Sequence, residues 1–221
     1  MERRPRYVAM YKAIIFDLGG VLVHFDFRRA YQSMAEVCPY AAGAISERIA
    51  ATGLVERFET GLVEPGDFFA QLSRTLELRL DYDGFCRIWN RIFTVPLLPE
   101  SLLEGLASRY RLLLLSNTNA IHFAMIRQAY PMLRHFQEVV LSFEVRALKP
   151  GPEIFRVAIG RAGCRPEECF YTDDTAAHVD AARALGIDAV RFVDRDQLER
   201  ELTARGIRWD CPGLLKGGRV R

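Results

Sequence analysis

Four short polar segments in this sequence follow or interrupt apolar runs, and together they hold the groups that phosphoryl transfer requires. A carboxylate can attack phosphorus, carboxylate oxygens can bind Mg²⁺, and a lysine with a hydroxyl can neutralise and orient phosphoryl oxygens. Crowded carboxylates also repel one another, so a cation is needed to hold them together. The groups are Asp17, Ser116, Lys149 and the pair Asp173-Asp174.

Each group also has a simpler interpretation. Asp17 could cap a turn, and Ser116 or Asn119 could cap the start of a helix. Asp173-Asp174 could do the same, and Lys149 could be an ordinary surface cation. The chain contains 30 lysines and arginines, but only Lys12, Lys149 and Lys216 are lysines. Because lysine is so scarce in this chain, the lysine at position 149 is more plausibly a functional residue than an ordinary surface cation.

The surrounding pattern predicts that these groups meet at one edge of a parallel sheet. Apolar strands are expected at 13–16, 111–115, 139–143, 168–172 and 188–192, with helices near 99–108, 120–129, 152–162, 176–185 and 195–204. Strands alternating with helices indicate βαβ units and hence a parallel sheet. In such sheets ligands bind beyond the carboxyl ends of the strands, where Asp17 and the other groups would lie.

A helical block separates the first strand from the others. Helices are plausible near 28–38, 43–59, 66–76 and 82–93, with a break at Pro65-Gly66. We therefore expect a Rossmann-like α/β core domain, residues 1–24 and 95–221, and an inserted all-helical cap domain, residues 25–94. A cap above the carboxyl edge would act as a lid and would determine the substrate. Its aromatic residues are expected to form mostly its own core.

The order of these segments resembles the haloacid dehalogenase (HAD) superfamily of phosphohydrolases across nearly the whole chain. Phe-Asp-Leu-Gly-Gly-Val-Leu is similar to the first family motif, and Leu-Ser-Asn-Thr-Asn to the second. Leu-Lys-Pro-Gly-Pro-Glu-Ile-Phe and Tyr-Thr-Asp-Asp-Thr are similar to the third and fourth, and Phe58–Gly61 with Phe68 and Phe69 is similar to the helical cap. Within the superfamily, the sequence most resembles bacterial α-D-glucose-1-phosphate phosphatases, which share Gly19 and Ser-Asn-Thr-Asn.

The resemblance implies a role for each group. Asp17 would be the nucleophile and a Mg²⁺ ligand, and Ser116 with the backbone of Asn117 would hold phosphoryl oxygens. Lys149 would screen the charge between Asp17 and the phosphate. The metal site would be completed by Asp174, Asp173 and the carbonyl of Gly19. The implied activity is Mg²⁺-dependent hydrolysis of a small phosphomonoester, such as a sugar 1-phosphate, through an aspartyl phosphate.

Gly19 departs from the family pattern, because most phosphatases of the superfamily have an Asp there as general acid and base. Acid–base help of this kind contributes about 10²- to 10⁴-fold in rate. Three hypotheses follow: the substrate has a good leaving group, another residue such as His24, Asp26 or Asp173 substitutes, or the chain only binds phosphorylated ligands. A haloacid dehalogenase remains an alternative, although the acidic pair is unfavourable in a metal-free, anion-binding site.

The composition of the chain limits the kinds of binding partner that can be expected. The net charge is only +2 and no charge run stands out, which gives no support for nucleic-acid or polybasic membrane binding. The five cysteines form no zinc-like grouping, so reduced thiols in a cytoplasmic protein are expected. No apolar run is long enough to span a membrane. The expected partner is a small phosphorylated metabolite, and the protein could be a monomer or a homodimer.

Overall fold

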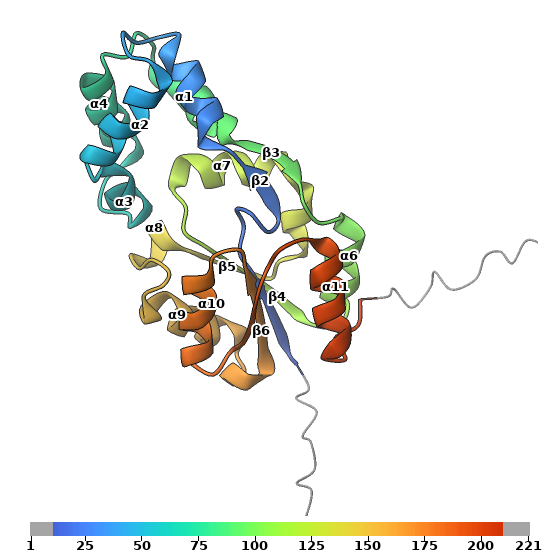
Figure 1. Cartoon of the computed structure of the whole chain (residues 1–221). Coiled ribbons are helices and arrows are strands. Elements are labelled where there is room, and N and C mark those ends of the chain that lie inside the picture. The colour runs from blue at the N-terminus through green and yellow to red at the C-terminus, as the bar shows by residue number, and fades with distance from the viewer. Residues whose placement is uncertain (1–10, 210–221) are drawn as a thin grey trace, which may run out of the picture.

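A five-stranded sheet forms the centre of the structure, a computed structural model that describes residues 11–209 (Figure 1). Its strand order is β5-β4-β1-β6-β7, and every neighbouring pair is parallel. This confirms the predicted Rossmann-like fold. The strands are β1 (Ala13–Phe16), β4 (Arg111–Ser116), β5 (Glu138–Leu141), β6 (Cys169–Asp173) and β7 (Asp188–Arg191).

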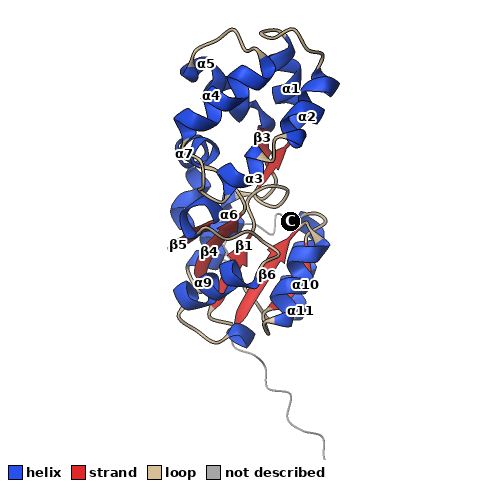
Figure 2. Ribbon diagram, turned by 90° about the vertical axis from the view of Figure 1, so that its left-hand side faces the viewer, coloured by secondary structure: helices blue, strands red, loops and turns tan. Residues whose placement is uncertain are grey.

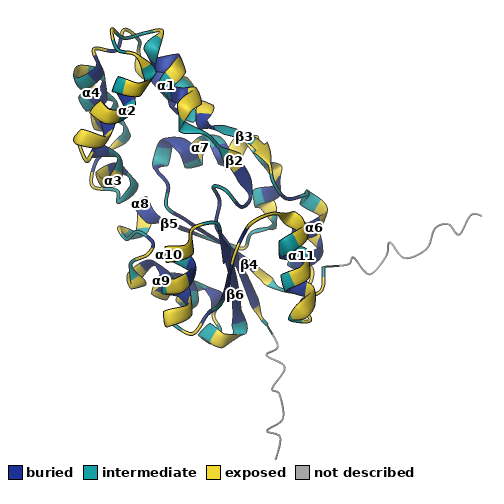
Figure 3. Cartoon of the chain, viewed as in Figure 1, coloured by how far each residue is buried: buried dark blue, intermediate teal, exposed yellow. Residues whose placement is uncertain are grey.

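Helices cover both faces of the sheet, because successive strand side chains point to opposite sides. In β1, Ile14 and Phe16 pack in one apolar cluster with α6 (Glu100–Ala107), α7 (Ala120–Ala129) and α11 (Arg195–Ala204). Ala13 and Ile15 pack in a second cluster with α9 (Pro152–Ala162) and α10 (Ala176–Ala184). All four β1 side chains are fully buried, and the central strands β4 and β6 are mostly dark blue in Figure 3. The sheet is therefore a rigid base for whatever lies at its edge.

A short antiparallel ribbon connects this core to a group of helices beyond the carboxyl edge of the sheet (Figure 2). The chain leaves the core through β2 (Val23–Phe25) and returns through β3 (Phe93–Pro96). The intervening helices are α1 (Phe27–Ala35), α2 (Ala42–Ala51), α3 (Leu54–Glu59), α4 (Pro65–Leu76), α5 (Tyr82–Trp89) and the 3₁₀ turn Asn90–Ile92.

The helical group has an apolar core of its own, as the sequence predicts for its aromatic residues. Phe58 stacks on Phe68 with ring centroids 4.1 Å apart, and Phe85 stacks on Trp89 at 5.7 Å. All four rings are buried. Tyr82, by contrast, lies at the surface with 37% of its area exposed.

Three predicted elements differ from the structure. The helix expected at 43–59 is two helices, because Gly53 adopts a left-handed conformation (φ 61°) that interrupts it. The helix expected at 82–93 ends at Trp89, since Phe93 begins β3. The strand expected at 139–143 ends at Leu141, where the one-turn helix α8 (Ser142–Val145) follows. Neither strand of the connecting ribbon was predicted, because each is only three or four residues long.

The remaining described segments are the 3₁₀ turns Pro131–His135 and Pro166–Glu168. Within residues 11–209, no helix is both long and apolar enough to cross a bilayer. The predicted core domain also includes residues 1–10 and 210–221, which lie outside the described part of the chain.

Candidate active site

The carboxyl edge of the sheet brings Asp17, Ser116 and Asp173 together. β1 lies between β4 and β6, and Phe16 at its end pairs with Leu114 on one side and Thr172 on the other. The residues that follow these positions therefore leave three adjacent strands at the same edge. Lys149 reaches the same place from the loop before α9. The meeting of these groups agrees with the sequence prediction.

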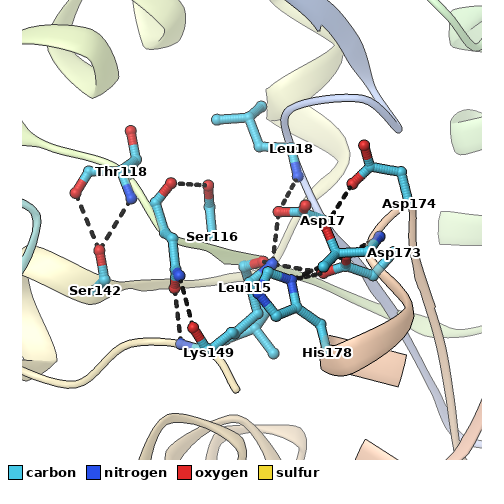
Figure 4. A network of polar contacts seen from close by, with 12 residues as sticks. Asp17, Leu18, Leu115, Ser116, Thr118, Ser142, Lys149, Asp173, Asp174 and His178 are labelled. Carbon is cyan, nitrogen blue, oxygen red and sulfur yellow. Dashed lines mark hydrogen bonds and ion pairs between the residues drawn. The ribbon is translucent and has the colours of Figure 1, made fainter. Parts of the chain in front are cut away.

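Lys149 forms the centre of this arrangement (Figure 4). Its Nζ lies 2.8 Å from Asp17 Oδ1 and 2.7 Å from Asp173 Oδ2, and it donates to the carbonyl of Leu115 at 3.1 Å. The residue is only 3% exposed, so it is not a surface cation. Burial lowers the pKa of this ammonium, but the Asp17 and Asp173 carboxylates more than offset that effect and raise it. Lys149 is therefore charged.

Asp17 is held by one of its two carboxylate oxygens. Oδ1 accepts the backbone N–H of Leu18 at 2.7 Å and the ammonium of Lys149. Burial raises the pKa of Asp17 to about 6, and the charge of Asp173 adds to the rise while Lys149 opposes it. Among the described residues none donates to Oδ2, which leaves this oxygen available to attack.

Asp173 is the most fully hydrogen-bonded carboxylate of the group. Oδ2 accepts the phenol of Tyr171 in addition to Lys149, and Oδ1 accepts the N–H of Thr175 at 2.8 Å. His178 Nδ1 lies 3.1 Å from both oxygens. Although burial raises the pKa of Asp173, the contacts to His178, Lys149 and Tyr171 lower it overall. Asp173 therefore stays ionised and fixes the position of Lys149.

His178 is a site residue that the sequence analysis missed. It lies in the first turn of α10, five positions after Asp173, and its ring faces that carboxylate (Figure 4). The Asp-Asp pair followed by a helix that carries a histidine was the available signal. The spacing of His178 to the other histidines does not resemble a metal site, so histidine spacing alone gives this residue no role.

The three carboxylates fit a divalent cation. Asp17, Asp173 and Asp174 each offer one oxygen, and these atoms lie within 4.8 Å of one another. Lys149 is the cation in contact with them, so their charge is only partly neutralised. Burial, and then the charge of Asp173, raises the pKa of Asp174. Crowded oxygen ligands with excess negative charge are what Mg²⁺ prefers. We call Asp17, Lys149, Asp173 and Asp174 the carboxylate cluster.

Gly20 is required beside this cluster. Its φ is 75°, and a Cβ at this position would lie 2.3 Å from Asp174 Oδ2. Any larger residue would displace the Asp174 carboxylate.

The segment after β4 shapes the other wall of the site. The side-chain amide of Asn117 donates to the carbonyl of Lys149 and accepts from its N–H, both at 2.9 Å. The N–H and carbonyl of Thr118 are both bonded to Ser142 Oγ, at 2.9 and 3.0 Å. Asn119 caps α7 by accepting from the N–H of His122. These bonds lock the Ser116 segment and the lysine loop together.

A cavity of about 170 Å³ opens next to the carboxylate cluster, between the core and the helical cap. The core contributes Gly19, Ser116, Thr118 and His122, and the chain from the connecting ribbon onward contributes Phe25, Phe27, Phe93 and Glu59. We call this space the aromatic cavity. Sequence reasoning missed Phe25, Phe27, Glu59 and His122 as lining residues. Its size restricts the occupant to a small molecule.

Phe25 explains why residue 19 is a glycine. A Cβ on Gly19 would lie 2.9 Å from two atoms of the Phe25 ring, closer than real Cβ contacts. The place where a side chain at position 19 would start is thus occupied by an aromatic ring of the connecting ribbon.

The residues suggested to replace an acid at position 19 have other contacts. Asp26 caps α1 and is paired with Arg28, whose hydrogen bond lowers its pKa. Asp173 is held ionised as described. His24 is exposed, and its Nδ1 lies 2.8 Å from Thr94 Oγ1. None of the three lines the aromatic cavity.

Residues 11–186 match the family model of the haloacid dehalogenase-like hydrolases. The chain belongs to this family. The HAD resemblance of its four motifs is thereby confirmed, and the chain is a hydrolase.

Relatives of this HAD-family chain include a D-ribitol-5-phosphate phosphatase of Bacteroides thetaiotaomicron, 26% identical over 88% of this chain and 98% of that protein. A phosphatase of Mycobacterium tuberculosis is 28% identical over 91% of this chain and 98% of its own length. Among solved structures, a HAD family enzyme from Bacteroides thetaiotaomicron in complex with magnesium and inorganic phosphate has a TM-score of 0.76. It is 28% identical and covers 83% of this chain and 95% of that chain.

Proposed function

We propose that the protein is a Mg²⁺-dependent phosphatase that hydrolyses a small phosphomonoester through a phosphate ester on Asp17. The observation that carries the proposal is the carboxylate cluster: a buried lysine joins the candidate nucleophile to an acidic pair at the carboxyl edge of the sheet. The relatives named phosphatases, and the related structure that contains magnesium and phosphate, support it.

Magnesium would be held by Asp17 and Asp174, with Asp173 and the carbonyl of Gly19 as further ligands. Asp174 is the least engaged of the three carboxylates, with a single contact from Thr175 Oγ1 at 3.4 Å, whereas Asp173 already accepts several hydrogen bonds. When bound, the ion would neutralise the negative charge of the phosphate.

The protein's own residues would carry out two displacements at phosphorus. Asp17 Oδ2 forms a bond to phosphorus while the bond to the substrate oxygen breaks, and that oxygen leaves as an alkoxide that takes a proton from water to become an alcohol; the water that later attacks phosphorus returns a proton to the solvent. Water then attacks phosphorus, the bond to Asp17 breaks, and inorganic phosphate departs. Lys149 offsets the charge between Asp17 and the phosphoryl group, and Ser116 with the backbone N–H of Asn117 orients its oxygens.

A good leaving group is the interpretation of Gly19 that the surroundings favour. Phe25 occupies the space beside Gly19, and the three nearby candidates for an acid have other contacts. A sugar 1-phosphate, such as glucose 1-phosphate, has a leaving oxygen that needs less protonation than an ordinary alkoxide. Ribitol 5-phosphate is a second candidate, because a relative is named for it. Its leaving oxygen is an ordinary alkoxide, so turnover equal to that of glucose 1-phosphate would contradict the leaving-group interpretation of Gly19.

We further propose that residues 25–94 act as a separate cap domain over the core, residues 1–24 and 95–221. The two-stranded ribbon is the only described covalent connection between the two parts, and the helical segment has its own aromatic core. Cytoplasmic location, and assembly as a monomer or homodimer, stay predictions.

Phosphate release from para-nitrophenyl phosphate and glucose 1-phosphate tests the function. We expect turnover with Mg²⁺, none with EDTA, and a loss of at least about 10³-fold in kcat in Asp17→Asn. Asp180→Asn is the matched control, because this exposed carboxylate on α10 lies outside the site.

Two results would redirect the proposal. Chloride release from a 2-chloroacid without added metal, together with no phosphate release, would indicate the dehalogenase alternative. No turnover of any substrate by the folded protein would indicate a protein that only binds phosphorylated ligands.

A further inference from the structure

The aromatic cavity contains two polar groups that have no partner in the described part of the chain. One is the imidazole of His122, whose buried Nε2 lacks a hydrogen bond. The other is the carboxyl group of the half-buried Glu59, for which no described residue provides a hydrogen bond or an ion pair. A buried polar atom without a partner, such as His122 Nε2, is rare, and an absent ligand is one explanation for it.

His122 is a neutral ring that presents a hydrogen-bond acceptor. Its Nδ1 lies 2.9 Å from Asn90 Oδ1, and since that oxygen only accepts, Nδ1 carries the proton and Nε2 is a lone pair. Burial lowers the pKa of His122 to about 3, which keeps the ring uncharged. The ring stacks on Trp89 at 5.4 Å and meets Phe93 edge-on at 5.0 Å. Its orientation is therefore fixed.

Glu59 reaches the cavity from the last residue of α3, which the core holds in place. Two positions later, Gly61 (φ 66°) approaches the backbone of α8 so closely that a Cβ would lie 2.1 Å from the carbonyl oxygen of Phe143. Burial raises the pKa of Glu59 to about 7, with a smaller contribution from the charge of Glu56. No described cation compensates this carboxyl group.

We infer that Glu59 and His122 select a hydroxyl-rich, uncharged leaving group, so that the substrate class is a polyol or sugar phosphate. Both groups accept hydrogen bonds, and hydroxyl groups donate them. The rings of Phe25, Phe27 and Phe93 supply the apolar surface against which the C–H faces of such a molecule pack. This inference rests on the proposed phosphatase function and names its substrate.

Anionic leaving groups fit this cavity less well. A second phosphate or a carboxylate would meet the carboxyl group of Glu59 and the lone pair of His122, both of which repel it. An ammonium group would pair with the Glu59 carboxylate, so phosphoethanolamine is the compound that distinguishes recognition of a cation from recognition of hydroxyl groups.

A matched pair of substrates tests the inference. Ribitol 5-phosphate and pentyl phosphate have the same carbon chain and differ in the hydroxyl groups. With Mg²⁺, we expect the wild-type kcat/KM to favour ribitol 5-phosphate by at least about tenfold, the equivalent of one to two hydrogen bonds. Para-nitrophenyl phosphate reports phosphatase activity independently of hydroxyl recognition.

Paired variants of His122 separate recognition from structure. In His122→Asn the amide retains a donor near Nδ1, toward Asn90, but removes the acceptor at Nε2. His122→Gln is the matched control, since its longer amide places an oxygen near the position of Nε2. We expect the ratio of the two kcat/KM values to fall about tenfold in His122→Asn and to recover in His122→Gln. Glu59→Leu is expected to reduce the same ratio, and Glu59→Gln, which keeps an acceptor oxygen, to reduce it less.

The possible outcomes are distinguishable. If the wild-type enzyme hydrolyses both substrates equally, hydrolyses neither while it turns over para-nitrophenyl phosphate, or prefers phosphoethanolamine, the inference is wrong while the phosphatase function stands. If all variants keep the wild-type ratio, Glu59 and His122 do not select the substrate. If the enzyme releases phosphate from none of these compounds, including para-nitrophenyl phosphate, the proposed function itself fails.

Discussion

The carboxylate cluster and the aromatic cavity lie side by side, but they differ in whether their polar groups have partners within the protein. In the carboxylate cluster, Lys149 contacts both Asp17 and Asp173, and Asp173 is fully hydrogen-bonded. In the aromatic cavity, Glu59 and His122 Nε2 have no partner among the described residues. Lys149, Asp173 and His122 are buried, whereas Asp174 and Glu59 are half-buried, so each region contains groups of both kinds and burial alone does not explain the difference.

On the proposed function, the groups of the carboxylate cluster must be in position before the substrate binds, whereas the polar groups of the aromatic cavity receive their hydrogen bonds from the substrate. Attack at phosphorus needs a nucleophile and a lysine in set positions, and internal ion pairs provide this. Selection of a leaving group needs polar atoms that remain free until the right molecule supplies their hydrogen bonds. On this proposal, the chain itself orders the first region, and the substrate would supply the missing hydrogen bonds of the second.

Removing Lys149, the central cation of the carboxylate cluster, should cause the largest loss in the free energy of unfolding. Lys149→Met leaves two buried carboxylates without their ion pair, which costs about 3–5 kcal/mol of unfolding free energy. Urea unfolding at pH 8 in EDTA measures it, and phosphatase turnover should be lost in the same variant. Lys12→Met is the control: Lys12 pairs with Glu168 but is 56% exposed, so we expect less than about 1 kcal/mol. Equal stability of the two variants would contradict the role of Lys149.

Adding a side chain at position 19, where the carboxylate cluster and the aromatic cavity meet, should cause a smaller loss in the free energy of unfolding. Gly19→Ala and Gly19→Asp place a Cβ against the Phe25 ring, and overpacking of this kind costs about 1–3 kcal/mol. Phe25→Ala opens the space. We therefore expect each double variant to be more stable than the sum of its single changes by about 1–2 kcal/mol, measured in a double-mutant cycle.

Additive free energies in that cycle would mean that Phe25 does not determine the residue at position 19. A second readout concerns chemistry rather than packing. Gly19→Asp with Phe25→Ala introduces the family's acid, whereas Gly19→Ala with Phe25→Ala does not. A gain in turnover of alkyl phosphates only in the first double variant would attribute the missing acid to the ring of Phe25.

The carboxylate cluster could be predicted from sequence because one simple rule governs it. Parallel strands end at the same edge, so Asp17, Ser116 and Asp173 meet there once the strands are recognised. Lys149 was identifiable from its motif and from the scarcity of lysine in the chain. The predicted roles of these residues as nucleophile, phosphate-binding groups and metal ligands remain predictions.

The aromatic cavity could not be predicted in the same way, because it depends on how two separate parts of the chain pack. Glu59 reaches the cavity because Gly61 rests on the backbone of Phe143, a contact between residues far apart in sequence. Neither hydrophobic periodicity nor motif spacing carries such information. The two strands of the connecting ribbon were missed for a related reason, since three or four residues give no recognisable alternation.

The smallest expected effect is the change in melting temperature caused by Glu59→Gln. It tests whether the unpartnered carboxyl group of Glu59 destabilises the folded protein. With a pKa of about 7 in the folded protein and an ordinary value of 4.5 in the unfolded chain, Glu59 holds its proton more tightly when folded. Stability therefore falls as the pH rises from about 4.5 to 7 and stays lower above that range. Glu59→Gln removes this loss, so its melting temperature should exceed that of the wild type at pH 8 by about 3 °C and by less at pH 5.5.

Glu47→Gln provides the comparison, because Glu47 is exposed on α2 and its change should shift the melting temperature little at either pH. If the melting temperature rises in a pH-dependent way only in Glu59→Gln, the ionisable carboxyl group of Glu59 lowers the stability of the folded protein. Since natural proteins accept such losses mainly where a site must bind something, that result would place Glu59 with the groups that await a ligand. Equal melting curves at both pH values would instead mean that Glu59 is solvated, and the contrast between the two regions would then rest on His122 alone.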